Sequence, residues 1–65
     1  MATDQEIINI IRDMMAPGLP LGLQALKASV LTEDRSRVEP IVNGMVRYGQ
    51  LTEIKKHRYI ANKEG

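Results

Sequence analysis

Hydrophobic residues between positions 36 and 48 recur at spacings of three and four, which is the period of a helix with one buried face. The apolar side of this segment carries Val38, Ile41, Val42, Met45 and Val46. The opposite side carries a polar stripe, which consists of Arg37, Pro40, Asn43, Gly44 and Arg47. We predict a helix from Ser36 to Tyr48 that Gly49 ends, because the residue after a helix often takes a positive φ that glycine adopts without strain.

The start of this helix carries a capping signal. Ser36 is followed three residues later by Glu39, and such a pair can satisfy two free N–H groups of the first turn. With Ser36 as the N-cap, Pro40 is the fourth helical residue, where its missing N–H removes at most one weak hydrogen bond. We therefore begin the helix at Ser36 rather than at Asp34.

A second amphipathic segment lies near the beginning of the sequence. Thr3 and Glu6 form another capping box. The apolar side chains that follow fall within an arc of about 160°, taking about 100° per residue. They are Ile7, Ile8, Ile10, Ile11, Met14 and Met15. Because Pro17 and Gly18 interrupt the pattern, we predict a first helix that ends near Met15.

Shorter elements connect these two helices. Leu19 to Leu21 fits a short edge strand, with both leucines on one side. The stretch from Gly22 to Ser29 fits a short helix, whose apolar stripe consists of Leu23, Leu26 and Val30. Residues 31–35 are rich in Thr, Glu and Asp, so we predict a turn there.

After Gly49 the helical period gives way to two short strand-like runs. Residues 51–54 and 58–61 are the predicted strands of a hairpin, and its basic tip is Lys55-Lys56-His57-Arg58. Residues 62–65 are expected to form a flexible tail. The order of elements predicts one α+β domain over residues 1–65, a winged helix-turn-helix with three helices and a small two- to three-stranded antiparallel sheet. The expected core consists of Ile7, Ile11, Met14, Leu23, Leu26, Val38, Ile41, Val42, Met45, Leu51 and Ile60.

Charge is distributed unevenly along a chain whose net charge is only +1. Residues 1–34 contain two basic and five acidic side chains, whereas residues 35–65 contain seven basic and three acidic ones. The basic side chains therefore gather in the predicted third helix and hairpin, where a winged helix would meet nucleic acid.

Composition argues against several classes of function. The sequence has no Cys and one His, so we expect no disulfide and no metal site. It has no acid–base pair in a plausible cleft and no glycine-rich phosphate loop, so we expect neither enzyme activity nor a cofactor. No apolar run approaches the ~20 residues of a membrane span, and the start lacks a signal-peptide core. We therefore expect a cytoplasmic protein that makes no membrane contact.

Residues 5–61 resemble the small winged-helix domain at the N-terminus of bacterial ribonuclease R enzymes. The resemblance rests on four segments, which are Pro20-Leu21, Tyr48-Gly49-Gln50-Leu51, Lys55-Lys56 and Arg58-Tyr59. The chain departs from that pattern at Gly22, where the second helix usually opens with Thr or Ser. No segment here corresponds to the cold-shock or nuclease domains of those enzymes. The resemblance therefore implies a fold and a preference for nucleic acid, but no ribonuclease activity.

The polar stripe and the basic tip together predict a site for double-stranded DNA. Asn43 and Arg47 are expected to read base edges, since Asn can pair with adenine and Arg with guanine in the major groove. Small Gly44 is expected to let the helix lie deep in that groove. Arg35 and Ser36 are expected to meet phosphates at the helix start, which Arg37 anchors, and Pro40 continues the same row. The rest of the predicted site is the basic tip, with Lys55, Lys56, His57 and Arg58 on the backbone or the minor groove.

Two other interpretations stay open. A winged helix can also use these surfaces to bind a protein, and the modest net charge and the acidic first half favour such a module. A stand-alone reader of one half-site binds weakly, so a DNA-binding regulator is expected to form a homodimer or to assemble on DNA. The wide apolar face of the first helix is a candidate for that interface. A non-enzymatic transcriptional regulator is the interpretation that we favour.

Overall fold

Helices occupy most of the first two thirds of the chain, and a β-hairpin follows them. The elements of the computed structural model, which describes residues 1–62, are α1 (Asp4–Met15), β1 (Leu21–Gly22), α2 (Leu23–Ala28), the 3₁₀ helix η1 (Thr32–Asp34), α3 (Arg35–Arg47), β2 (Leu51–Lys55) and β3 (Arg58–Ala61). The three strands form an antiparallel sheet in the order β1-β3-β2. This is the helix and wing order of a winged helix-turn-helix, so the predicted fold class is confirmed.

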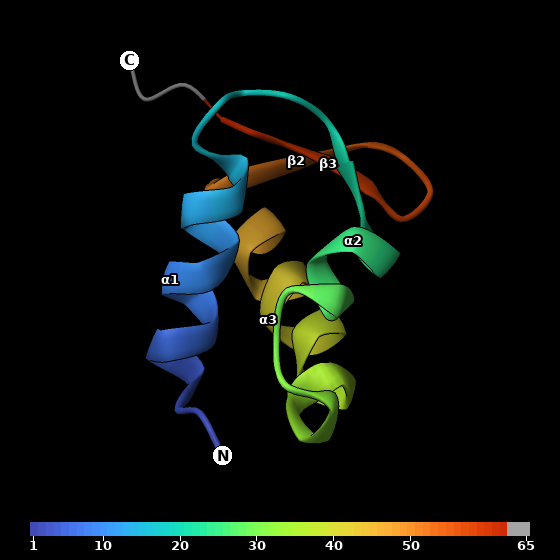
Figure 1. Cartoon of the computed structure of the whole chain (residues 1–65). Coiled ribbons are helices and arrows are strands. Elements are labelled where there is room, and N and C mark those ends of the chain that lie inside the picture. Colours follow the sequence, from blue (N-terminus) through green and yellow to red (C-terminus); the bar gives the residue numbers. More distant parts are fainter. Residues whose placement is uncertain (63–65) are drawn as a thin grey trace.

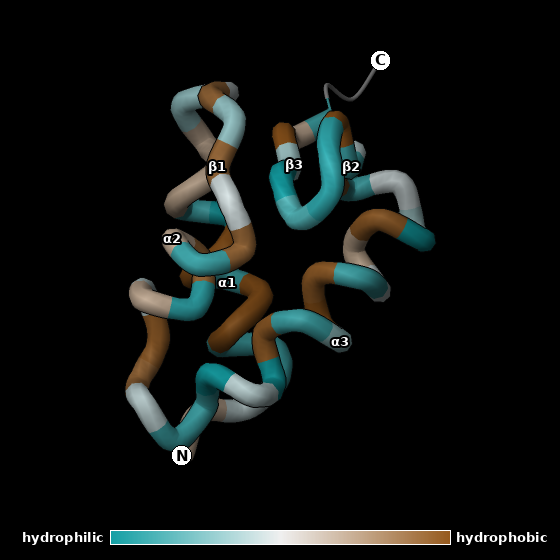
Figure 2. The backbone as a smooth tube through the Cα atoms, turned by 90° about the vertical axis from the view of Figure 1, so that its right-hand side faces the viewer, coloured by the Kyte–Doolittle hydropathy of each residue, from teal (hydrophilic) through white to brown (hydrophobic). Residues whose placement is uncertain are grey.

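The three α-helices form a bundle, and the sheet lies at one end of it. Figure 1 shows β2 and β3 at the end of the bundle where α1 finishes. In Figure 2, hydrophobic and hydrophilic segments alternate along α1 and α3, as expected for helices with one buried face. The loop between β2 and β3 is hydrophilic in the same view. The hairpin therefore carries a polar tip away from the packed end of the bundle.

The first helix begins as the sequence predicts. The Glu6 N–H donates to Thr3 Oγ1 at 3.2 Å, and the Thr3 N–H donates to Glu6 Oε1 at 3.0 Å, so both bonds of the capping box are present. The bond from the Thr3 N–H lowers the pKa of the exposed Glu6 carboxyl, because it favours the charged form. The helix ends at Met15, close to the predicted position.

The core joins the inner faces of all three α-helices to the sheet. Its buried hydrophobic members are Ile7, Ile11, Met15, Leu23, Leu26, Val30, Val38, Val42, Met45, Leu51 and Tyr59. Of the side chains predicted for the core, Met14 and Ile41 are only partly buried. Ile60 is also only partly buried, because Tyr59 is paired with Leu21 and points inward, which turns the next residue of the strand to the opposite face.

The start of α3 corrects the sequence-based prediction. The 3₁₀ helix η1 runs directly into α3, so Asp34 takes the N-cap position and Ser36 is already the second helical residue. The predicted Ser36–Glu39 capping box is therefore wrong, and Pro40 is the sixth residue of the helix rather than the fourth. The Asp34 side chain does not cap α3 either, because its carboxylate accepts hydrogen bonds from Ala2 and Arg37.

The short elements also differ in detail from the predictions. The first strand contains Leu21 and Gly22, while Leu19 lies outside it and is exposed. Gly49 has φ +80°, as expected for the residue that ends α3. Asn62, expected to begin a flexible tail, donates from its backbone N–H to the Gln50 carbonyl at 3.1 Å and from its side chain to the Gly49 carbonyl at 2.6 Å. The remaining tail positions, 63–65, lie outside the described residues.

Candidate nucleic-acid interface

The outer face of α3 is the side of the helix that points away from the core. It carries the exposed residues Ser36, Pro40, Asn43 and Arg47, whose spacings of four, three and four residues align them in one row along the helix. Arg35 is also exposed, at the first helical position. Neither Arg35 nor Arg47 makes an ion pair within residues 1–62, so their charges stay available to a ligand.

A shallow depression lies on this face. Its volume is about 310 Å³, and its lining consists of Pro40, Asn43, Gly44, Arg47 and Tyr48. Tyr48 is 81% exposed, which is a large apolar surface to leave in water at the end of a helix. Among the described residues, a Cβ built on Gly44 would meet no atom within 4 Å outside its own stretch of helix, so no neighbour there requires a glycine.

Replacing Gly44 by Ala should therefore stabilise the free protein, and it should weaken the binding of any ligand that approaches α3 closely. A glycine inside a helix costs about 0.5–1 kcal/mol relative to alanine. We expect urea unfolding of Gly44→Ala to show a gain of about that size, because the new methyl group enters open space. Duplex-DNA titration of the same variant should show weaker binding. Unchanged DNA affinity would mean that no ligand atom comes close to Gly44.

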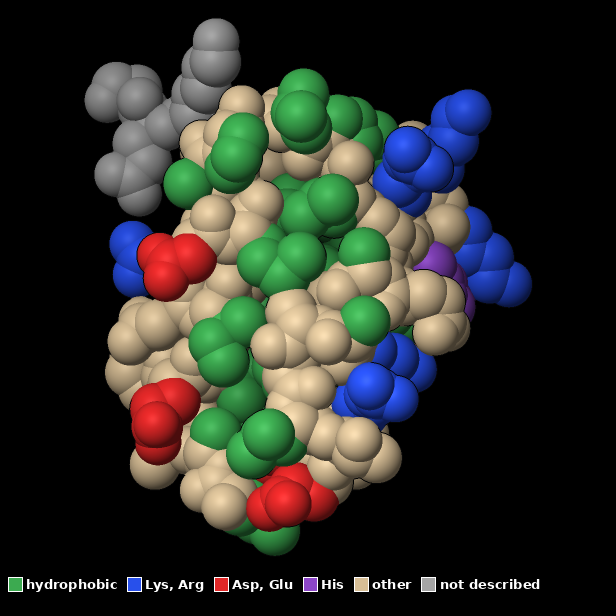
Figure 3. Space-filling view, viewed as in Figure 1, with side chains coloured by type: hydrophobic (Ala, Val, Ile, Leu, Met, Phe, Trp, Pro, Cys, Tyr) green, Lys and Arg blue, Asp and Glu red, His purple; other side chains and the backbone are tan. Residues whose placement is uncertain are grey.

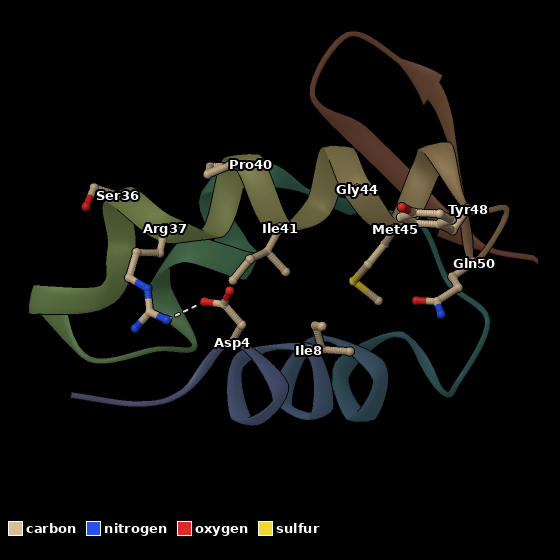
Figure 4. Close-up of a pocket in the computed structure, with 10 residues that line it drawn as sticks. All are labelled: Asp4, Ile8, Ser36, Arg37, Pro40, Ile41, Gly44, Met45, Tyr48 and Gln50. Carbon is tan, nitrogen blue, oxygen red and sulfur yellow. Dashed lines mark hydrogen bonds and ion pairs between the residues drawn. The ribbon is translucent and has the colours of Figure 1, made fainter.

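Arg37 does not belong to the outer face, contrary to the prediction of one exposed stripe. Its guanidinium bonds to the Asp4 carboxylate, to Asp34 Oδ1 at 3.1 Å and to the Ala2 carbonyl, and the side chain is 29% exposed. Figure 4 shows it reaching from α3 towards Asp4 at the start of α1. The bond to Asp4 is the main cause that raises the pKa of Arg37. Two carboxylates thus compensate its charge, and its role within the domain is to hold the first turn of α3 against α1.

Asp34 is the buried centre of this network. It is fully buried, and its Oδ2 accepts the Ala2 N–H at 3.1 Å. That bond lowers the pKa of the Asp34 carboxyl; burial opposes the change, and the bond from Arg37 supports it. Sequence reasoning missed this role because the bond to Ala2 joins residues 32 positions apart, and no local pattern indicates it.

The wing is the β2–β3 hairpin with its basic tip. Lys55, Lys56, His57 and Arg58 are all exposed, and none of them makes an ion pair within the described part of the chain. The Lys55–Arg58 pairing leaves Lys56 and His57 as the turn, in which His57 has the left-handed φ of +60°. Two of these side chains therefore lie in the turn, and the other two lie on the strand residues that flank it.

Backbone hydrogen bonds fix the position of this turn. The His57 N–H donates to Glu53 Oε2 at 2.9 Å, and the His57 carbonyl accepts the Leu23 N–H at 2.8 Å. The second bond satisfies the N–H of Leu23, the first residue of α2, which has no partner inside the helix. Neither role could be read from the sequence, because each depends on how the hairpin pairs and packs.

The wing and the outer face of α3 lie on the same side of the molecule. In Figure 4 the hairpin extends past α3 on the side away from α1, where Ser36 and Pro40 also point. Figure 3 shows Lys and Arg side chains around His57 at one edge of the molecule, whereas the acidic side chains in that view lie towards the opposite edge and the N-terminal end of the bundle. The exposed helix face and the basic loop are therefore oriented towards the same side of the molecule.

The other chemical features of the structure are few. Within residues 1–62, no group of three or more His, Asp or Glu side chains is placed to hold a metal ion. No helix among the described residues has the length and hydrophobicity needed to cross a bilayer. Comparison of the chain with protein-family models, with curated proteins and with solved structures found no match.

Proposed function

We propose that this protein is a non-enzymatic, cytoplasmic binder of double-stranded DNA and acts as a transcriptional regulator. The observation that carries the proposal is the common orientation of the outer face of α3 and the wing, whose cations have no ion-pair partner within residues 1–62. A helix of this kind fits the major groove, and a basic loop beside it fits the adjacent backbone or minor groove. No cofactor or membrane is needed for this function.

The residues divide into two roles in this proposal. Asn43 and Arg47 contact base edges, because both are exposed and their side chains can each make two hydrogen bonds to a base. Arg35 and Ser36 lie in the first turn of α3, where an exposed guanidinium and an exposed hydroxyl favour a phosphate. The wing cations bind phosphates without regard to sequence. Arg37 supports the site indirectly, since it fixes the first turn of α3.

Asn43→Ala tests base reading. Duplexes would first be selected from a random pool with the unaltered protein, and affinities then measured on the selected site and on random DNA. We expect the substitution to cost about 1–3 kcal/mol on the selected site and much less on random DNA. Asn9→Ala is the matched control, since Asn9 is an exposed asparagine on α1. Equal losses on both DNAs would make Asn43 a backbone contact.

Tyr48 favours a second candidate function, in which the same face binds a protein. An aromatic side chain that is 81% exposed is typical of the anchors at protein interfaces. The salt dependence of the affinity separates the two functions. Affinity for DNA falls steeply as the salt concentration rises. Affinity for a protein that binds around Tyr48 falls mainly when that side chain is truncated. An NMR titration with random-sequence duplex DNA should shift residues 35–47 and 55–58 if the first function holds. Absence of shifts in both ranges would favour the protein partner.

A further inference from the structure

A groove runs along the junction of α1 and α3, and its lining also includes Ser36, Pro40 and Gly44 of α3 and Tyr48 just after that helix. Its volume is about 470 Å³. Ile8 of α1 and Ile41 and Met45 of α3 form its apolar walls, and the Asp4–Arg37 ion pair closes one end (Figure 4). Ile8 and Ile41 are only partly buried by the domain itself, so the groove leaves apolar surface in contact with water.

A second hollow continues this groove towards the end of α1. It has a volume of about 450 Å³, shares Met45 and Gln50 with the first, and has Arg12 in its lining. The two hollows are together the α1–α3 groove. Asp4 thus lies at one end of the groove and Arg12 towards the other, both on α1.

The spacing of these side chains along α1 is regular. Asp4, Ile8 and Arg12 follow one another at intervals of four residues, so they lie on one side of the helix and span about 12 Å. Ile8 is the midpoint of the row. The Asp4 side chain is 72% exposed in spite of its bond to Arg37, and Arg12 is exposed and makes no ion pair within residues 1–62. The row therefore presents an anion, an apolar side chain and a cation, in that order.

We propose that a second copy of this chain occupies the groove, with the two α1 helices packed antiparallel about a two-fold axis at Ile8. In this arrangement the row runs in opposite directions in the two copies. Arg12 of each copy therefore lies opposite Asp4 of the other, and the surface is complementary to itself. This is what an isologous interface requires. Ile8 then meets its equivalent at the axis and covers the apolar wall of the opposite groove. Contact between Asp4 and Arg12 occurs twice in such a dimer.

Arg37 does not oppose this arrangement, although it lies beside Asp4. Its single positive charge faces two carboxylates, those of Asp4 and Asp34, which leaves a surplus negative charge at this end of the groove. An approaching guanidinium is therefore attracted there. The dimer does not rest on the proposed DNA binding, since it uses neither the wing nor Asn43 and Arg47. Its groove does share Ser36, Pro40, Gly44 and Tyr48 with the face of α3 described above, so dimerisation is measured without DNA.

Sedimentation of the full chain without DNA tests the dimer. Between about 5 µM and about 500 µM, the average mass should rise from that of one chain towards that of two. Arg12→Asp and Asp4→Arg should each remain single chains over this range, because each places like charges opposite one another twice. An equimolar mixture of the two variants should regain the mass of a dimer, because every pair in the mixed dimer is again opposite in sign. Asp13→Arg, on another side of α1, should behave as the unaltered chain.

A circular-dichroism melt of each variant checks that it is still folded. This control matters most for Asp4→Arg, because Asp4 also accepts a hydrogen bond from Arg37. Ile8→Ser removes the apolar midpoint without changing charge, and it should reduce dimerisation by at least about tenfold while the helical spectrum is retained. The proposal is overturned if the unaltered chain stays single at the highest concentration. A dimer that is insensitive to Arg12→Asp, or folded variants whose mixture fails to associate, would overturn it equally.

Discussion

Replacing Lys55, Lys56 and Arg58 together by Ala should weaken binding to every duplex sequence alike. The slope of the logarithm of affinity against the logarithm of salt concentration should fall by about three units, because each phosphate contact that is lost releases about one counterion fewer. The three side chains are exposed and make no ion pair in residues 1–62, so their loss should leave the fold intact. Fluorescence anisotropy of labelled DNA over a series of salt concentrations measures both the affinity and the slope.

A charge-conserving control distinguishes loss of charge from disturbance of the turn. Lys55→Arg with Lys56→Arg should keep the original slope, since the guanidinium groups also bind phosphate. If the triple Ala variant keeps the original slope as well, the wing contacts solvent or a protein rather than DNA. The Asn43→Ala measurement would then be the remaining test of whether the outer face of α3 binds DNA.

Asp34→Asn should lower the melting temperature at pH 7 by about 5–10 °C. The amide can still accept the Ala2 N–H, but it removes a charge from a fully buried position that faces Arg37. A thermal melt followed by circular dichroism measures the change. Asp13→Asn is the control, since Asp13 is an exposed carboxylate of α1 without an ion pair within residues 1–62, and it should melt as the unaltered chain does.

The same carboxylate predicts how stability depends on pH. The folded pKa of Asp34 lies below its ordinary value of 3.8, so its contribution is fully present above that value and is lost as the pH falls through the folded pKa. Between pH 7 and pH 5 this group should leave stability unchanged. Below about pH 4, the melting temperature of Asp34→Asn should fall less steeply with pH than that of the unaltered protein. Protonation of Glu6, whose folded pKa is also lowered, should account for part of the remaining fall. If the melting temperatures of both proteins fall equally with pH, Asp34 does not contribute to the loss of stability in acid.

Most interactions between near neighbours in the chain were predictable from the sequence, the Ser36–Glu39 capping box being the exception. The Thr3–Glu6 capping box, the end of α1 and the positive φ at Gly49 each depend on residues only a few positions apart. The switch of period after Gly49 likewise predicted the hairpin, which the pairing of β2 with β3 confirms. Local chemistry and hydrophobic period were therefore enough to predict the order of elements and the fold class.

Interactions between distant segments could not be predicted in this way. Asp34 turns its carboxylate to Ala2, and this contact helps to explain why α3 does not begin with Ser36 as its cap. Arg37 has the helical position of an exposed residue, but α1 supplies Asp4 as its partner. Spacing along α3 placed Asn43 and Arg47 on an exposed face correctly, because no other segment of residues 1–62 covers that face. The exposure predicted for these two side chains is therefore confirmed, whereas their contact with DNA stays a prediction.

The hydrogen bond between the His57 carbonyl and the start of α2 has a consequence for the entropy of binding. A loop that is free in solution loses conformational freedom when it settles on a ligand, and this loss subtracts from affinity. Here the turn is held to α2 through His57 and to its own strand through Glu53 before any ligand arrives. The wing is therefore preorganised, and its backbone amides should show NMR order parameters close to the value of about 0.85 that is typical of a rigid backbone.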